Sequence, residues 1–423
     1  MKTIFKLMPV MMVLLFCSCN QREVEELSQV SLKGSIAENS LVESVTLDLL
    51  NKFSKSLRNS SLTKSENSII VDESIKTTYH FKWNHETNTK SNGPQIPDSV
   101  SVDLYLMKFH EADGTLGYSI ATGDERINKV YVYSHGDISD TARIYPLAHI
   151  IKSIPFIVKN DLENYYKNPS ETIHTYGARP DITTHGPLLC THWHQEYPYN
   201  SQIKAFPVMN AHPTLKGHAP VGCAATATAQ VVTFYSKFKS DIMANGKPYV
   251  YNFSKFAFVA VPGEDAQFEV SQLCKEIGIA LGIDYYPTVG ILYDPRKIGT
   301  YLADKQGYSV ETKYHKNIDI NKLADLIMKN NPHITAGVMH GTTSGHVWVW
   351  DGVQMNWNTN EVMMVHCNWG MGIQKDSDFG SDTWFTPATM SQIDSQQPAL
   401  TDDQVQIYLS NNNSYYPGGG GIL

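Results

Sequence analysis

Five residues have the types needed for catalysis by a nucleophilic cysteine. A thiolate attacks a carbonyl carbon when a histidine takes its proton, and Cys223 and His346 can supply this pair. Asn368 can fix the imidazole tautomer with its side-chain oxygen, and Trp369 can shield that hydrogen bond from water. Gln195 can donate to an oxyanion together with the backbone N–H of Cys223. The set indicates acyl transfer through a thioester.

The sequence around Cys223 predicts that the thiol lies in the first turn of a helix. Pro220 and Gly222 break the chain in "PVGC", and "CAATATAQVVTFYSKF" then runs without glycine or proline to Phe238. The N–H groups and the dipole at a helix N-terminus favour an anion, so we expect the pKa of the thiol to fall. Apolar side chains recur at helical spacing in this run: Val231, Phe234, Tyr235 and Phe238.

The histidine and the asparagine are expected on two strands. After the turn "SG", apolar residues alternate from His346, and Trp348 and Trp350 share its face. A second strand, "VMMVHCN", ends at Asn368 and is followed by Gly370. The base therefore lies at the start of a strand, close to a loop.

The first part of the chain is expected to be a compact α+β module. Alternation in "SVSVDLYLMKFH" and "INKVYVYSHG" predicts strands. Apolar spacing from Val42 to Phe53 predicts a helix, and "PLAHIIKSIPFIVKNDLENYYKN" predicts a helical region interrupted at Pro155. Residues 168–187, "NPSETIHTYGARPDITTHGP", show no apolar period and are interpreted as an exposed linker.

The N-terminus resembles a bacterial lipoprotein signal. In "MKTIFKLMPVMMVLLFCSCN", Lys2 and Lys6 precede an apolar run that is too short to span a membrane. We expect residues 1–19 to be the signal peptide and Cys19 to carry the lipid, with Cys17 as the second candidate. A plain secretory signal, cleaved nearby, is the alternative.

Composition excludes several classes of protein. The 423 residues are 42% hydrophobic and carry a formal net charge of -8 without a basic block, so we expect a sizeable core and no nucleic-acid partner. His192 and His194 in "HWH" have no nearby carboxylate pair or third histidine, so we expect no metal and no cofactor. The cysteines outside the signal are far apart and form no CxxC: Cys190, Cys223, Cys274 and Cys367.

Four blocks of the sequence resemble the streptopain family of papain-like cysteine peptidases. They are "GPLLCTHWHQEYPYN", "VGCAATATAQVVTFY", "SGHVWVWDGV" and "HCNWGMG", and they occur in the order found in the family. The resemblance implies that Cys223 is the nucleophile, His346 the base and Gln195 the oxyanion donor. It also implies that Asn368 and Trp369 support the histidine.

The same resemblance implies the fold and the domain organisation. A papain-like domain at residues 181–410 would have a helical part that carries the nucleophile and an antiparallel sheet part that carries the histidine. "YSIATGDERINKVYVYSH" is similar to the propeptide of the family, so residues 20–180 are expected to be an α+β propeptide domain, with a flexible tail at 411–423. This propeptide is expected to pack against the cleft and either fill it or displace His346 from Cys223.

We therefore expect a lipid-anchored cysteine endopeptidase, made as a zymogen, that acts on proteins and peptides. It would be exported to the bacterial cell envelope, on the outer membrane or released from it. One alternative is a transglutaminase or cell-wall amidase that uses Asp351 after His346. Another is an inactive binding lipoprotein, which is expected to have lost Cys223, His346 or Gln195. Met371 stands where the family has tryptophan, which leaves substrate preference open.

Overall fold

The computed structural model describes the chain in segments, which include every residue of the expected catalytic set. The expected signal at 1–19, most of the linker and the tail lie outside the described residues. Within the described segments no helix is both long and apolar enough to cross a membrane. The segments are residues 41–58, 69–82, 97–112, 114–138, 145–167, 182–206, 213–256, 264–315, 318–338, 345–370, 382–389 and 404–410.

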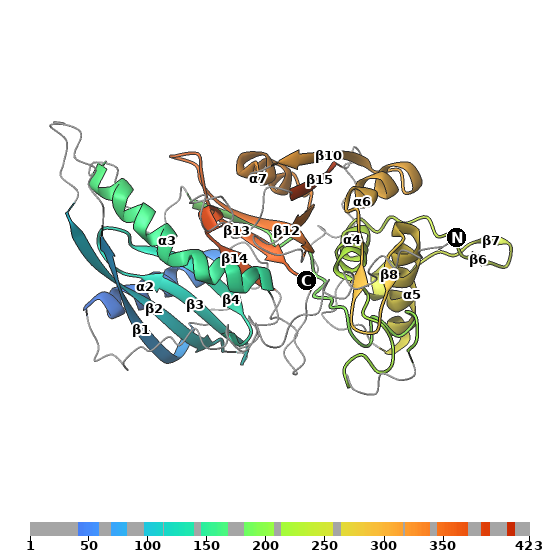
Figure 1. Cartoon of the computed structure of the whole chain (residues 1–423), viewed down its shortest axis with the longest axis horizontal. Helices are drawn as coiled ribbons and strands as arrows, with labels where there is room; N and C mark the ends of the chain where they lie inside the picture. The colour runs from blue at the N-terminus through green and yellow to red at the C-terminus, as the bar shows by residue number, and fades with distance from the viewer. Residues whose placement is uncertain are drawn as a thin grey trace, which may run out of the picture.

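One antiparallel sheet of eleven strands runs through the molecule (Figure 1). Its strand order is β1-β2-β3-β4-β14-β13-β12-β11-β15-β10, and β5 pairs with β12 beside this path. The strands are β1 (Ile70–Lys82), β2 (Ser99–His110), β3 (Leu116–Thr122), β4 (Lys129–His135), β5 (Ile182–His185), β10 (Ser309–His315), β11 (His333–Val338), β12 (Gly345–Asn356), β13 (Glu361–Asn368), β14 (Asp382–Phe385) and β15 (Gln404–Ser410).

The helices of the described segments confirm the expected mixture of helices and antiparallel strands. They are α2 (Leu41–Arg58), α3 (Tyr145–Lys167), α4 (Cys223–Phe234), α5 (Glu264–Leu281), α6 (Arg296–Thr300) and α7 (Ile320–Met328), with short helical turns at Phe253–Lys255, Tyr301–Lys305 and Pro387–Thr389. Two small hairpins complete the fold: β6 (Met243–Ala244) with β7 (Lys247–Pro248), and β8 (Asp284–Tyr285) with β9 (Gly290–Ile291).

The sheet joins two regions that are distant in the sequence. We call α2, β1 to β4 and α3 the N-terminal module; it occupies the left of Figure 1. Its strand β4 pairs with β14, and the hydroxyls of Ser134 and Thr383 lie 3.1 Å apart across this pairing. One apolar core includes side chains from both sides of the join, such as Ile154 of α3 and Trp350 of β12. The N-terminal module thus shares a sheet and a core with the rest of the chain.

Helix α3 differs from the sequence-based expectation, because it continues through Pro155. A proline inside a helix removes one backbone hydrogen bond. Here the apolar face of α3 is buried against the sheet on both sides of the proline, at Ile150, Ile154 and Ile157. This packing holds the helix together and outweighs the local preference for a break.

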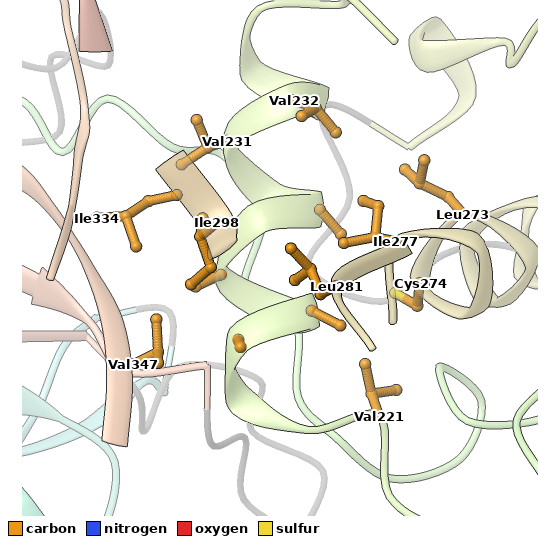
Figure 2. Close-up of a cluster of buried hydrophobic side chains, with 14 of the residues drawn as sticks. Val221, Val231, Val232, Leu273, Cys274, Ile277, Leu281, Ile298, Ile334 and Val347 are labelled. Carbon is orange, nitrogen blue, oxygen red and sulfur yellow. The ribbon is translucent and has the colours of Figure 1, made fainter. Parts of the chain in front are cut away.

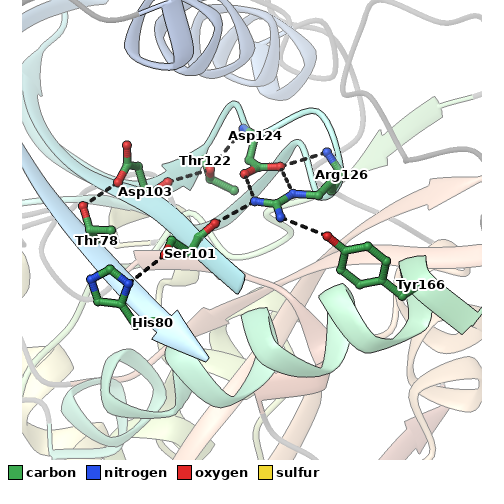
Figure 3. A network of polar contacts seen from close by, with 8 residues as sticks. All are labelled: Thr78, His80, Ser101, Asp103, Thr122, Asp124, Arg126 and Tyr166. Atoms are coloured by element: carbon green, nitrogen blue, oxygen red, sulfur yellow. Dashed lines mark hydrogen bonds and ion pairs between the residues drawn. The ribbon is translucent and has the colours of Figure 1, made fainter. Parts of the chain in front are cut away.

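A polar network fixes the far end of α3 to the module's sheet (Figure 3). The Arg126 guanidinium forms two hydrogen bonds with the Asp124 carboxylate, at 2.8 and 2.5 Å. It also donates to the backbone oxygen of Ser101, at 2.7 Å, and to the hydroxyl of Tyr166, at 3.2 Å. Tyr166 lies in the last turn of α3, so the network holds the chain immediately before the linker.

Helix α4 lies between the sheet and α5 (Figure 2). Val347 of β12 and Ile334 of β11 contact one side of it, while Ile277 and Leu281 of α5 pack on the other. The helix can be enclosed in this way because most of its buried side chains are alanine, threonine or valine. It begins at Cys223, as predicted, and ends at Phe234, four residues earlier than the apolar spacing suggested.

Candidate active site

Cys223 is the first residue of α4, and a glycine immediately before it makes the turn into the helix possible. Gly222 has a φ of 85°, a left-handed conformation that favours glycine. A Cβ on Gly222 would lie 3.3 Å from the backbone oxygen of Gly290 in β9. Cys223 itself is half-buried and takes part in no disulfide. The backbone therefore sets the thiol at the N-terminal end of a buried helix.

The segment that carries Gln195 runs beside the approach to the nucleophile. The backbone oxygen of Gln195 accepts a hydrogen bond of 2.8 Å from the N–H of Val221, two residues before Cys223. Trp193 anchors the segment, because its ring is fully buried against the rings of Tyr199 and Phe256. The Gln195 side chain is half-buried. Its backbone is thus held close to the chain that enters α4.

His346 lies at the start of β12, as expected, and its ring is held by a backbone carbonyl. Its Nε2 is 2.8 Å from the oxygen of Trp369. Burial lowers the pKa of His346 to about 4, although the Trp369 hydrogen bond acts in the opposite direction. The ring is therefore neutral at pH 7. Because a carbonyl only accepts, the hydrogen is on Nε2 and the lone pair on Nδ1.

Trp369 follows the last residue of β13 and closes one side of the histidine. Its buried ring lies 5.5 Å from the ring of Trp348 and 6.4 Å from that of His346, measured between centroids. The residue therefore contributes both an apolar wall and the carbonyl that fixes the imidazole. The wall was expected from the sequence; the carbonyl was not.

Asn368 is the last residue of β13, and its side-chain amide forms its hydrogen bonds with residues other than His346. Its Oδ1 accepts from the N–H of Gly370 and from Nε2 of Gln230, both at 3.1 Å. Its Nδ2 donates to the backbone oxygen of Thr191, at 2.7 Å, and to Oε1 of Gln230, at 3.2 Å. In this structure the amide connects β13 to α4 and to the chain near Gln195.

Gln230 was not recognised in the sequence. It is a fully buried side chain on α4, and its amide faces that of Asn368. A signal was present, because Gln230 is the only long polar residue in the run of small residues after Cys223, and it follows the cysteine by two helical turns.

Other titratable groups near the sheet have partners of their own. Asp351 is buried with His366, with Oδ1 and Nδ1 2.6 Å apart, and its second oxygen accepts from the N–H of Leu189. Burial lowers the pKa of His194 to about 4, and its Nδ1 accepts from the N–H of Glu196. Among the described residues no group of three histidine, cysteine or acidic side chains is arranged to hold a metal ion.

Comparison with known proteins gives consistent matches. Residues 193–379 match the model of the Peptidase C10 family. Streptopain from Streptococcus pyogenes is 24% identical in an alignment of 301 residues that covers 63% of this chain and 72% of streptopain. The streptopains of S. pyogenes serotypes M18 and M1 match with the same identity and coverage. The family match includes every member of the expected catalytic set: Gln195, Cys223, His346, Asn368 and Trp369.

Proposed function

This chain is a cysteine peptidase of the streptopain family, peptidase C10, and we propose that it is an exported endopeptidase that is made as a zymogen and acts through Cys223 and His346. The observation that carries this proposal is the hydrogen bond from Nε2 of His346 to the carbonyl of Trp369. It directs the basic nitrogen, Nδ1, to the other side of the ring, where a thiol can give up its proton.

The proposed reaction has two stages. Nδ1 of His346 takes the proton of the Cys223 thiol, and the thiolate adds to the carbonyl carbon of the scissile peptide bond. The Gln195 side-chain amide and the N–H of Cys223 donate to the oxyanion that forms. The imidazolium then gives its proton to the leaving amine as the peptide C–N bond breaks. The acyl group remains on Cys223 as a thioester. Water hydrolyses the thioester, with His346 as the base.

The N-terminal module shares a sheet and an apolar core with the catalytic part, which supports a latent full-length chain, and the protonation state of His346 agrees with it. A thiolate–imidazolium pair needs a charged histidine, but burial holds the pKa of this ring at about 4. Desolvation disfavours the charged form, so the pair is unfavourable in this arrangement. We propose that removal of the N-terminal module lets the ring reach a more polar environment and become charged beside the thiolate.

The linker is the proposed site of activation. The N-terminal module ends at Lys167, the last residue of α3, and the chain is described again from Ile182, the first residue of β5. The sequence between them was interpreted as an exposed linker, and such segments are typical sites of proteolytic cleavage. Lys167 and Arg179 are the proposed cleavage points, and the peptidase itself can make the cut.

An epoxide that alkylates papain-like thiols tests both the function and the latency. We expect rapid labelling of Cys223 in the trimmed protein and labelling at least about tenfold slower in an intact chain that carries Lys167→Gln and Arg179→Gln, because a neutral thiol reacts poorly. Mass spectrometry of the labelled peptide gives the position and the rate. Equal rates in both forms would show that the module is not inhibitory, and labelling of neither form would contradict a thiol peptidase.

The proposed location is the outside of a bacterial membrane, through lipid on Cys19. The motivation is the apolar run that ends in "LLFCSC". Cys19→Ser, with Cys17 intact, is expected to move the protein from the membrane fraction to the soluble fraction, as measured by immunoblot of fractionated cells. If this variant stays with the membrane while Cys17→Ser becomes soluble, the anchor is Cys17.

A further inference from the structure

Gln230 lies two helical turns after the nucleophile on the same face of α4. Seven residues separate it from Cys223, which is close to two full turns. Its side chain is fully buried, and both the oxygen and the nitrogen of its amide form hydrogen bonds. Oε1 accepts from the N–H of Trp193, at 3.1 Å, and from Nδ2 of Asn368, at 3.2 Å, while Nε2 donates to Oδ1 of Asn368, at 3.1 Å.

Each partner of Gln230 is adjacent to a group of the proposed mechanism. Trp193 is two residues before Gln195, the proposed oxyanion donor. Asn368 immediately precedes Trp369, whose carbonyl holds His346. One buried amide on the nucleophile helix therefore holds both the segment of the oxyanion donor and the segment of the histidine.

The chemistry of the site explains why an amide is needed at this position. A buried amide that loses its hydrogen-bond partners destabilises the fold, whereas an apolar side chain of similar volume could fill the same space. A fully paired amide fixes the positions of the two segments relative to each other. Its nitrogen donates to Asn368, and its oxygen accepts from both Asn368 and Trp193. Thr228 of the same helix shows the contrast: its hydroxyl bonds only to the Ala224 oxygen, within α4.

We propose that Gln230 is a positioning residue for peptide hydrolysis, which sets the Trp369 carbonyl and the Gln195 segment relative to Cys223. The inference rests on the proposed function of this site. Gln230 does not touch the substrate; it acts through Asn368 and through the backbone of Trp193. Small displacements of such groups can lower the rate by about 10²-fold, because the reacting atoms leave the productive geometry.

Gln230→Glu tests the proposal through its pH dependence. The introduced carboxyl has nearly the shape of the amide, and burial raises its pKa above the ordinary value of about 4.3. When protonated it can donate to Asn368 and accept from the Trp193 N–H; when ionised it loses the donor and turns a charge toward Oδ1 of Asn368. We expect kcat near that of the wild type at acidic pH, a fall of about tenfold or more as the carboxyl ionises, and little change in KM.

Two further variants complete the design. Gln230→Met fills the space without polar atoms and is expected to lower kcat by about 10²-fold at every pH. Thr228→Val changes another buried polar residue of α4 and is expected to leave kcat unchanged. All variants are made in the full chain and trimmed by a trace of wild-type protein, and a Cys223→Ala chain trimmed in the same way gives the background rate. Two outcomes would overturn the proposal. One is a Gln230→Glu protein whose kcat, divided by that of the wild type, does not change with pH. The other is a Gln230→Met protein with normal kcat.

Alkylation of Cys223 by iodoacetamide separates this inference from the proposed function. The reaction reports the thiolate, which depends on the position of His346, and it requires no peptide substrate. We expect Gln230→Met to slow it about tenfold near pH 7 and Thr228→Val to leave it unchanged. If the wild type cleaves no peptide but this pattern is found, the positioning role stands and the peptidase proposal fails. Equal alkylation rates in all three proteins would contradict the positioning role.

Discussion

Replacing Cys223 by alanine is expected to lower kcat for peptide hydrolysis by at least about 10⁴-fold, because the nucleophile is lost while the rest of the site remains. The fold should be retained, since the residue is half-buried at the start of α4 and alanine is the best helix former. The measurements are hydrolysis of a peptide library and thermal unfolding. The same chain is expected to stay at full length where the wild type shortens.

The matched control is Cys190→Ala, the same change at a cysteine on the surface. Partial burial and the Asp351 carboxylate raise the pKa of the Cys190 thiol, so it is a poor nucleophile at neutral pH. This variant is expected to keep wild-type activity. His346→Ala should be nearly as inactive as Cys223→Ala, because the thiol then lacks its base. Wild-type activity in Cys223→Ala would rule out the proposed mechanism.

Gln195→Ala is expected to lower kcat by about 10²–10³-fold with a small effect on KM, the usual effect of losing one oxyanion donor. The donor acts on the charge of the transition state, so substrate binding changes little. Steady-state kinetics on a peptide gives both constants. A variant that raises KM and leaves kcat unchanged would place Gln195 in substrate binding instead.

Gln202→Ala is the control for this change, since Gln202 is also half-buried and its bond to the Ser271 hydroxyl comes from its backbone N–H. Asn368→Ala is expected to reduce kcat less than loss of the nucleophile, because it acts only on the position of other groups. If Asn368→Ala proved as inactive as Cys223→Ala, Asn368 would have a more direct role than positioning.

Local patterns were sufficient for the elements that carry the proposed site. Pro220 and Gly222 before a run of small residues placed the start of α4 at Cys223, and strict alternation placed His346 at the start of a strand. These features depend on neighbours in the sequence, which is why they can be read from it. The matches to the Peptidase C10 family and to streptopain agree with the family that these blocks indicated.

Features that depend on contacts between residues far apart in the sequence could not be predicted from local patterns. The role of the Trp369 carbonyl follows from backbone geometry that no side-chain type reveals. The sequence suggested that Asn368 contacts His346 directly. Instead, both the oxygen and the nitrogen of the Asn368 amide form hydrogen bonds with Gln230, which lies 138 residues earlier in the chain. Packing against the sheet likewise overrode the local effect of Pro155.

The pairing of β4 with β14 has a consequence for the order in which the molecule forms. Ser134 and Thr383, which meet in this pairing, are 249 residues apart. A chain synthesised from its N-terminus completes β1 to β4 long before β14 exists, and contacts of such separation form slowly. The edge of β4 therefore stays open through most of translation, and an open edge is a template for pairing with other chains. The four residues of β14 close it only when nearly the whole chain has been made.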